Sequence, residues 1–223
     1  MGDFLGDLPT VLIATAGGYL LGSIPLAYLI SKRHSGVDIF EVGTGLPGAS
    51  NVMRNVGKLP AVMVFLGDMA KGALAILLGN VMGVESPWLL LPAGAAVLGH
   101  WKSMFTGFRG GDGLVTLGGA IFALFPLHGF ISVAVASIVA LGGQKLPYSS
   151  LLNVVFGYAA LAALTVRYNP EDTALVFGMG GLCGLVLAHA LLGHRRRRRA
   201  GDQWQDDDEW DEVPDSTGAT EQS

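Results

Sequence analysis

Long apolar runs alternate with short polar segments along most of the chain. The runs cover residues 8–30, 59–81, 88–100, 114–141, 151–166 and 173–192. Most of these runs are long enough, as helices, to cross a hydrocarbon core of about 30 Å. The strands of a transmembrane barrel would be shorter and would alternate apolar and polar positions. The pattern therefore predicts an all-α integral membrane protein.

The run 114–141 has two interpretations, because Pro126, His128 and Gly129 interrupt it. It is either one kinked span or two short helices. Two helices give seven transmembrane or half-membrane segments, with the N-terminus outside and the C-terminus inside, and place 12 of the 14 Lys and Arg residues on the cytoplasmic side. One span would put the arginines at 195–199 outside. We therefore expect seven segments, the first of them retained, since no cleavage site follows it.

Composition and charge support this class and divide the chain in two. Residues are 51% hydrophobic and only 14% charged, where soluble domains carry about 25% charged residues. Residues 200–223 hold nine acids and no Lys or Arg, whereas residues 1–199 hold all 14 basic residues and the other nine acids. This predicts a membrane domain over 1–199 and a disordered, acidic cytoplasmic tail over 200–223.

A glycine-rich polar stretch at 43–57 is the first candidate site. It combines glycines, side-chain donors and one arginine: Gly43, Gly45 and Gly48; Thr44, Ser50 and Asn51; and Arg54. Backbone N–H groups freed by glycines, together with a guanidinium, suit a phosphate. The alternative is an ordinary solvated loop between two helices.

Two charged residues, Asp68 and Lys71, lie inside the second apolar run. Spaced i and i+3, they share one helix face near the middle of the membrane, where charge is costly and is usually paired or functional. They either form a self-contained ion pair or support the cytoplasmic site.

A second glycine-rich polar stretch covers residues 99–113. His100 in this stretch could act as a general base or bind a phosphate, or could be structural. Arg109 among its glycines repeats the chemistry of an anion site, whereas the carboxylate of Asp112 opposes it. The glycines that accompany Arg109 are Gly110, Gly111 and Gly113.

Zinc-ligand spacings, a GxSxG elbow and a GxxxxGK[ST] phosphate loop do not occur in the sequence. The single Cys183 excludes a disulfide framework. Neither a metal nor a cofactor is expected, and the arginines at 195–199 are interpreted as a topology anchor and not as a nucleic-acid site.

Three motifs in order resemble those of the bacterial acyl-phosphate:glycerol-3-phosphate acyltransferases, the PlsY type. They are GVDIFEVGTGLPGASNVMRNVG at 36–57, DMAKG at 68–72 and LGHWKSMFTGFRGGDGLVT at 98–116, which follow a family-like first helix, YLLGSIPLAYLI. The resemblance covers about residues 10–193. It implies a seven-helix membrane enzyme of phospholipid biosynthesis with a cytoplasmic site in the bacterial inner membrane.

The implied reaction transfers a fatty acyl group from acyl phosphate to the sn-1 hydroxyl of glycerol 3-phosphate, giving lysophosphatidic acid and phosphate. The resemblance implies catalytic roles for Thr44, Asn51, Arg54 and His100. It implies substrate binding by the remaining residues of the three motifs: Gly43, Gly45, Gly48, Ser50, Asp68, Lys71, Arg109, Gly110, Gly111, Gly113 and Thr116. Its partners would be membrane lipid and the enzyme that forms the acyl phosphate.

Several positions depart from the family pattern. Phe40 replaces an arginine, Leu46 an asparagine and Ser103 a proline; Arg109 replaces a lysine and Asp112 reverses the charge of another. The asparagine of the C-terminal family motif falls on Arg197. An alternative function is therefore a diverged or inactive paralogue with another acceptor. A small-molecule transporter with broken helices is a further alternative.

Overall fold

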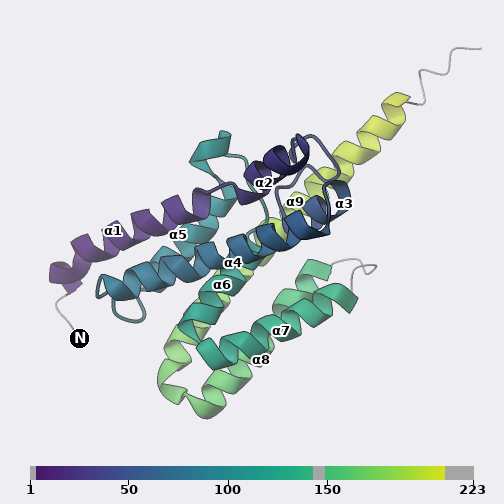
Figure 1. The fold of residues 1–223 in the computed structure, drawn as a ribbon. Helices are drawn as coiled ribbons and strands as arrows, with labels where there is room; N and C mark the ends of the chain where they lie inside the picture. The colour runs from purple at the N-terminus through teal and green to yellow at the C-terminus, as the bar shows by residue number, and fades with distance from the viewer. Residues whose placement is uncertain (1–3, 143–148, 209–223) are drawn as a thin grey trace, which may run out of the picture.

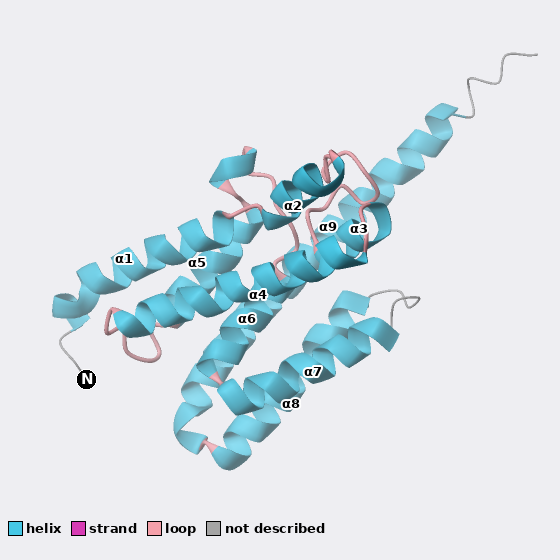
Figure 2. Ribbon diagram, viewed as in Figure 1, coloured by secondary structure: helices cyan, strands magenta, loops and turns pink. Residues whose placement is uncertain are grey.

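The computed structural model describes residues 4–142 and 149–208, and every regular element in this part of the chain is a helix (Figure 2). Lys145 and residues 209–223 of the predicted tail lie outside the described residues. Four helical segments are long and apolar enough to cross a membrane, at Leu8–Ser35, Lys58–Val81, Leu151–Tyr168 and Pro170–Gly193. The prediction of an all-α membrane protein is confirmed.

The first apolar run forms two helices where we expected one span. Helix α1 covers Phe4–Ser23 and α2 covers Leu26–Ser35, with the break at Ile24 and Pro25. Proline has no backbone N–H and therefore cannot continue the hydrogen-bond ladder of α1. The break leaves carbonyl groups of α1 without their usual helical donors, and the candidate site is built against them.

Helix α4, Lys58–Val81, is central to the bundle. It packs against α1, α2, α5 (Leu90–Trp101) and α6 (Leu114–Leu124). The short helix α3, Ala49–Asn55, precedes it. Because α1 and α5 end and α6 begins at the same end of the bundle, both glycine-rich stretches meet there (Figure 1).

The interrupted run 114–141 forms two helices, as the charge distribution predicted. Helix α6 ends at Leu124 and α7 covers Pro126–Gly142, with only Phe125 between them. Helix α7 doubles back and packs along α8, Ser149–Tyr168 (Figure 1). A proline begins α7, the position that tolerates the lost N–H.

Helix α9 covers Thr173–Asp208 and reaches beyond the apolar run that ends near residue 192. Residues 200–208 of the segment expected to be disordered therefore belong to this helix. The division of the chain into a membrane domain and an acidic tail stays a prediction.

Candidate active site

The buried side chain of Lys71 holds the break between α1 and α2. Across the break, the N–H of Leu26 donates to the carbonyl of Ile24, and the carbonyl of Gly22 is left without a helical donor. Lys71 Nζ donates to Gly22 O at 3.2 Å and to Ile24 O at 3.0 Å. A cation is therefore placed where the proline exposes backbone acceptors.

Lys71 also has two side-chain partners. Its ammonium lies 2.9 Å from Asp68 Oδ1, with 5% of its own side chain and 4% of the aspartate side chain exposed, and 3.2 Å from His100 Nδ1. An ammonium has three hydrogens, and four acceptors surround this one. Lys71 is thus saturated by the protein, which suits a group that positions its neighbours.

His100, at the end of α5, is buried and presents its two ring nitrogens to different surroundings. Nδ1 faces the polar cluster: Thr116 Oγ1 lies 3.3 Å away and Asp68 Oδ1 lies 3.7 Å away. Nε2 faces the second glycine-rich stretch, so that a Cβ added at Gly111 would lie 2.6 Å from it. The ring therefore connects the cluster to the glycine-rich backbone.

Two glycines bring α4 and α6 close enough for this cluster to form. A Cβ at Gly72 would overlap the backbone carbonyl of Thr116, and a Cβ at Gly119 would overlap that of Met69. Small residues at such crossings allow two backbones in a membrane bundle to approach closely. The glycine of DMAKG thus places Asp68 and Lys71 beside Thr116.

Asn51 holds the first glycine-rich stretch together from within. Its side chain is 2% exposed, and its amide nitrogen donates to the carbonyls of Ile39, Val42 and Leu46. Its carbonyl oxygen accepts from the N–H of Thr44 and from Asn55 Nδ2. Gly43 has a φ of 57° and leaves room for this oxygen. The asparagine therefore shapes the loop through its own contacts.

The other polar side chains of this stretch lie on its surface. Thr44, Ser50 and Arg54 are exposed, and Thr44 Oγ1 accepts from the N–H of Leu46. Gly45 has a φ of 65°, and Gly48 precedes α3 with an extended backbone. Pro47 of this stretch and Phe40, which precedes it, line the cleft described next, and the three exposed side chains do not.

A polar cleft lies where the α1–α2 break, α4 and the two glycine-rich stretches meet. The side chains that give it its chemistry come from three segments: Asp68 and Lys71; His100 and Arg109; and Phe40. The guanidinium of Arg109 lies over the ring of Phe40, 4.3 Å from its centroid. This cation–π contact joins the second glycine-rich stretch to the segment that precedes the first.

The backbone of the second stretch is held against the end of α5. Gly110 leaves no room for a side chain against the carbonyl of His100, and the N–H of Gly111 donates to that carbonyl at 3.2 Å. Trp101 Nε1 donates to the backbone carbonyl of Asp112 at 2.8 Å. Gly113, with a φ of 78°, is the N-cap of α6 and follows Arg109 by four residues.

Ser103 is a residue whose contribution sequence reasoning missed. We noted it only as the loss of a family proline, but its hydroxyl donates to the carbonyl of Ser23 at 2.5 Å. Tyr19 makes a neighbouring link, from its hydroxyl to the carbonyl of Lys102 at 2.8 Å. The break at Pro25 was the available signal, since its freed carbonyls require donors from elsewhere in the fold.

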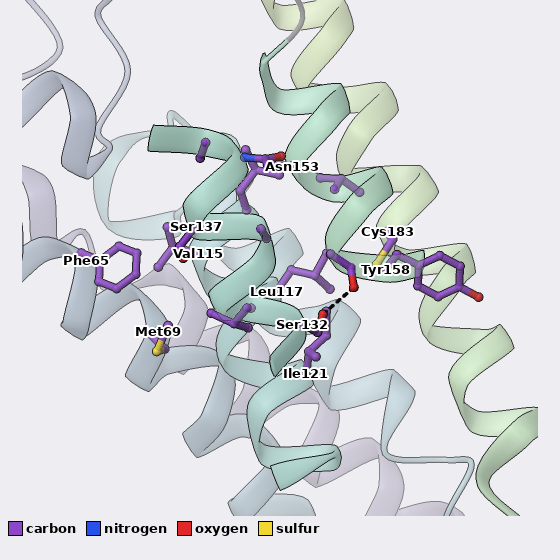
Figure 3. Close-up of a pocket in the computed structure, with 17 residues that line it drawn as sticks. Phe65, Met69, Val115, Leu117, Ile121, Ser132, Ser137, Asn153, Tyr158 and Cys183 are labelled. Carbon is purple, nitrogen blue, oxygen red and sulfur yellow. Dashed lines mark hydrogen bonds between the residues drawn. The ribbon is translucent and has the colours of Figure 1, made fainter. Parts of the chain in front are cut away.

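A second, apolar cavity of about 150 Å³ lies between α4, α6, α7 and α8, with Cys183 of α9 at its edge. Figure 3 shows Val115, Leu117 and Ile121 of α6 facing it, with Phe65 and Met69 of α4 on one side and Tyr158 of α8 on the other. The dashed line in Figure 3 is the hydrogen bond that the hydroxyl of Ser132 donates to the carbonyl of Gly157 at 2.7 Å. Helix α6 thus contributes both to this cavity and, through Thr116, to the polar cluster.

These features define a class: a helical membrane protein with a polar, cation-bearing cleft at one end of its bundle and an apolar cavity across α6. The comparisons with known proteins give the family. The family model described as glycerol-3-phosphate acyltransferase matches residues 12–199. The chain belongs to this family, as its three motifs predicted.

Individual relatives agree. A glycerol-3-phosphate acyltransferase of Synechococcus sp. (strain JA-2-3B'a(2-13)) is 36% identical over 211 residues, covering 92% of this chain and 99% of its own. Glycerol-3-phosphate acyltransferase 1 of Deinococcus radiodurans is 43% identical over 168 residues, or 75% and 84% of the two chains. The crystal structure of PlsY (YgiH), an integral membrane glycerol 3-phosphate acyltransferase in its glycerol 3-phosphate form, is similar with a TM-score of 0.66 and 31% identity, covering 85% of this chain and 90% of that one.

Proposed function

We propose that this protein transfers a fatty acyl group from acyl phosphate to the sn-1 hydroxyl of glycerol 3-phosphate in phospholipid biosynthesis. The hydroxyl oxygen attacks the acyl carbonyl carbon, the bond from that carbon to the phosphate oxygen breaks, and lysophosphatidic acid and phosphate are formed. The hydroxyl proton passes to a phosphate oxygen. The observation that carries the proposal is the buried cluster of Asp68, Lys71, His100 and Thr116 beside the Arg109 cleft.

The neighbours of His100 favour one of its two possible roles. A charged Lys71 can only donate, so Nδ1, at 3.2 Å, is the acceptor and a neutral ring carries its proton on Nε2. Nε2–H then faces the glycine-rich backbone as a donor. In this state the ring binds and orients a substrate oxygen, and a phosphate oxygen is the proton acceptor.

Charge stabilisation falls to Arg109. Its guanidinium lies at the cleft, and a planar fork of donors matches the oxygens of a phosphate. Acyl phosphate is an activated mixed anhydride, so positioning the two substrates and neutralising the leaving phosphate supply the catalysis without an enzyme nucleophile. Gly110, Gly111 and Gly113 allow the backbone to approach that phosphate.

We assign the exposed residues of the first stretch to substrate capture at the cleft mouth. Thr44, Ser50 and Arg54 point to solvent in the described structure and would contact glycerol 3-phosphate as it enters. Asn51 acts through the loop that it holds, with Gly43, Gly45 and Gly48 setting the loop's course. Asp68 and Lys71 support His100 from α4.

The apolar cavity suits a section of the fatty acyl chain. Its walls are formed by aliphatic and aromatic side chains of α4, α6 and α8, and the first residue of α6, Leu114, lines it only five residues after Arg109. An amphipathic donor could therefore place its chain on one side of the α6 N-terminus and its phosphate on the other.

We assign seven membrane segments. Helices α1 and α2 together form the first, each of the helices α4 to α9 forms one more, and the short helix α3 is not counted. The N-terminus is outside and the site faces the cytoplasm of a bacterial inner membrane, because basic residues gather at the site ends of the helices. Lys32 and Arg33 lie in the last turn of α2, Lys58 begins α4 and Lys102 follows α5. An enzyme that phosphorylates or otherwise activates fatty acyl groups must supply the donor.

An assay in reconstituted membranes tests the proposed function. Protein in liposomes is given acyl phosphate and radiolabelled glycerol 3-phosphate, and lysophosphatidic acid and phosphate are measured together. We expect equal amounts of the two products. Uptake of glycerol 3-phosphate into the liposomes without either product would instead support the transporter alternative, and turnover only with another acceptor would support the diverged paralogue.

A further inference from the structure

The segment that joins α5 to the cleft, residues 102–109, carries an exposed apolar cluster. Met104, Phe105 and Phe108 are 48%, 59% and 59% exposed; the first two belong to the short helix Met104–Thr106, and Phe108 follows it. In Figure 1 this segment projects from the bundle beyond the end of α5. Three large apolar side chains on so short a projection form a patch that soluble surfaces rarely show.

The projection is firmly built. Ser103 Oγ donates to Ser23 O at the end of α1 and accepts from the N–H of Phe105. The carbonyl of Ser103 accepts from the N–H groups of Thr106 and Phe108 at 3.2 and 2.8 Å. The apolar rings are therefore held outward by a fixed backbone that is tied to one end of α1.

Phe108 adopts a backbone conformation that aromatic residues rarely tolerate. Its φ is 61°, in the left-handed region, and it is the single non-glycine residue with a positive φ in the described part of the chain. Such strain, in a bulky residue, indicates that the position of the side chain matters. Here the strained backbone carries a ring that is 59% exposed.

The charges beside these rings suit an anionic lipid surface. Lys102 precedes the apolar cluster and is exposed, Arg109 follows it, and no acid lies between them. Aromatic side chains flanked by cations are typical of the boundary between headgroups and acyl chains. The Ser103–Ser23 bond ties the segment to the end of α1, and the segment directly follows α5, so it lies at the end of the bundle where both helices stop.

We propose that Met104, Phe105 and Phe108 form a membrane anchor that inserts into the headgroup–acyl boundary of the bilayer beside the cleft. The consequence for activity rests on the proposed function: because the anchor runs directly into Arg109, it holds the cleft mouth at the lipid surface, where an amphipathic donor arrives. Glycerol 3-phosphate, which arrives from water, does not depend on it.

Fluorescence tests insertion without requiring activity. In a Cys183→Ala background, Phe105→Cys is labelled with an environment-sensitive fluorophore in liposomes that contain anionic lipid, with Glu41→Cys, at an exposed loop position outside the candidate spans, as the control. We expect blue-shifted emission at 105 that headgroup-proximal spin-labelled lipids quench. Water-like emission, or a blue shift that spin-labelled lipids leave unquenched because a second copy of the chain covers the site, would overturn the proposal.

Kinetics test the consequence. Phe108→Gly removes the ring and relieves the left-handed strain, so it is expected to keep or raise the melting temperature. We expect it to raise the KM for acyl phosphate about fivefold, the effect of losing partial burial of one ring, with the KM for glycerol 3-phosphate unchanged. Phe130→Ala, which removes an exposed ring of α7, is the control. An unchanged KM for acyl phosphate in Phe108→Gly would contradict the anchor. If the wild-type protein showed no acyl transfer, the proposed function would be wrong, and the fluorescence result alone would decide whether the anchor inserts.

Discussion

Arg109 and Phe40 contact each other across the cleft, with the guanidinium carbon 4.3 Å from the ring centroid. Both positions depart from the family pattern, which has a lysine at 109 and an arginine at 40. The two departures meet in space: the chain replaces one cation by a ring on which the other stacks. Arginine suits such a stack better than lysine, because its guanidinium is planar and weakly hydrated.

The stacked pair predicts energetic coupling between the two residues. Phe40→Leu and Arg109→Lys should each lower kcat/KM for glycerol 3-phosphate. The loss of kcat/KM caused by Arg109→Lys should be about two- to fivefold smaller in the Phe40→Leu background than in the wild type. A double-mutant cycle measures this difference. In the control cycle, the effects of Phe130→Leu and Arg109→Lys on kcat/KM should be additive. If the effects of Phe40→Leu and Arg109→Lys were additive as well, this would contradict a positioning role for the Phe40 ring.

Lys71 should contribute to stability through its buried pair with Asp68. Lys71→Met leaves the carboxylate of Asp68 buried without its cation, so the free energy of unfolding should fall by about 3 to 5 kcal/mol. Adding Asp68→Asn removes the uncompensated charge and should recover part of the loss. Thermal unfolding in detergent measures both, with the exposed Lys58→Met as the control. A double variant less stable than Lys71→Met would count against the pairing.

The close crossing of α4 and α6 should be sensitive to a single methyl group. Gly72→Ala places a Cβ on the carbonyl of Thr116, so the helices must separate and stability should fall by about 1 to 3 kcal/mol. Activity should fall further, because the separation draws Lys71 and Thr116 away from His100. Gly181→Ala, on α9, meets no atom within 4 Å and is the matched control. Equal activity of the two alanine variants would argue against the crossing as the origin of the cluster.

The apolar cavity should set which acyl chains are used. Gly118 faces it, and the atom nearest to an added Cβ there is 3.6 Å away, so Gly118→Leu fits by filling the cavity. We expect kcat/KM to fall for long-chain acyl phosphates and to change little for short ones. Gly181→Leu, away from the cavity, should leave the chain-length profile of the wild type. A uniform loss at every chain length in Gly118→Leu would place the acyl chain elsewhere.

Much of this structure could be predicted from the sequence, for identifiable reasons. Apolar run lengths give the helices, and the basic residues decide that 114–141 is two helices, because only that division keeps the positive charges together. The pairing of Asp68 with Lys71 follows from their spacing on one helix. The gathering of His100, Arg109 and the DMAKG residues agrees with the motifs.

The remaining contacts depend on the tertiary fold. Pro25 signals a break with freed carbonyls, but no local pattern shows that Lys71 and Ser103 supply the donors, because these lie 47 and 80 residues away from their acceptors. Nor does spacing show that Asn51 uses its amide within its own loop, or that Thr44, Ser50 and Arg54 lie on the surface of that loop. The contacts of Lys71 and Ser103 are fixed by how the helices pack, and those of Asn51 by how its own loop folds.

The central claim, that the buried cluster presents Nε2–H of His100 to a substrate oxygen in acyl transfer, is tested most directly by substituting His100. Glutamine can place an amide N–H near the position of Nε2, whereas alanine cannot. The measurement is kcat for lysophosphatidic acid formation in liposomes, compared between wild type, His100→Gln and His100→Ala. The account predicts a loss of about 100-fold or more for alanine, the usual size of a lost transition-state donor, and a clearly smaller loss for glutamine. Wild-type kcat in His100→Ala would contradict it.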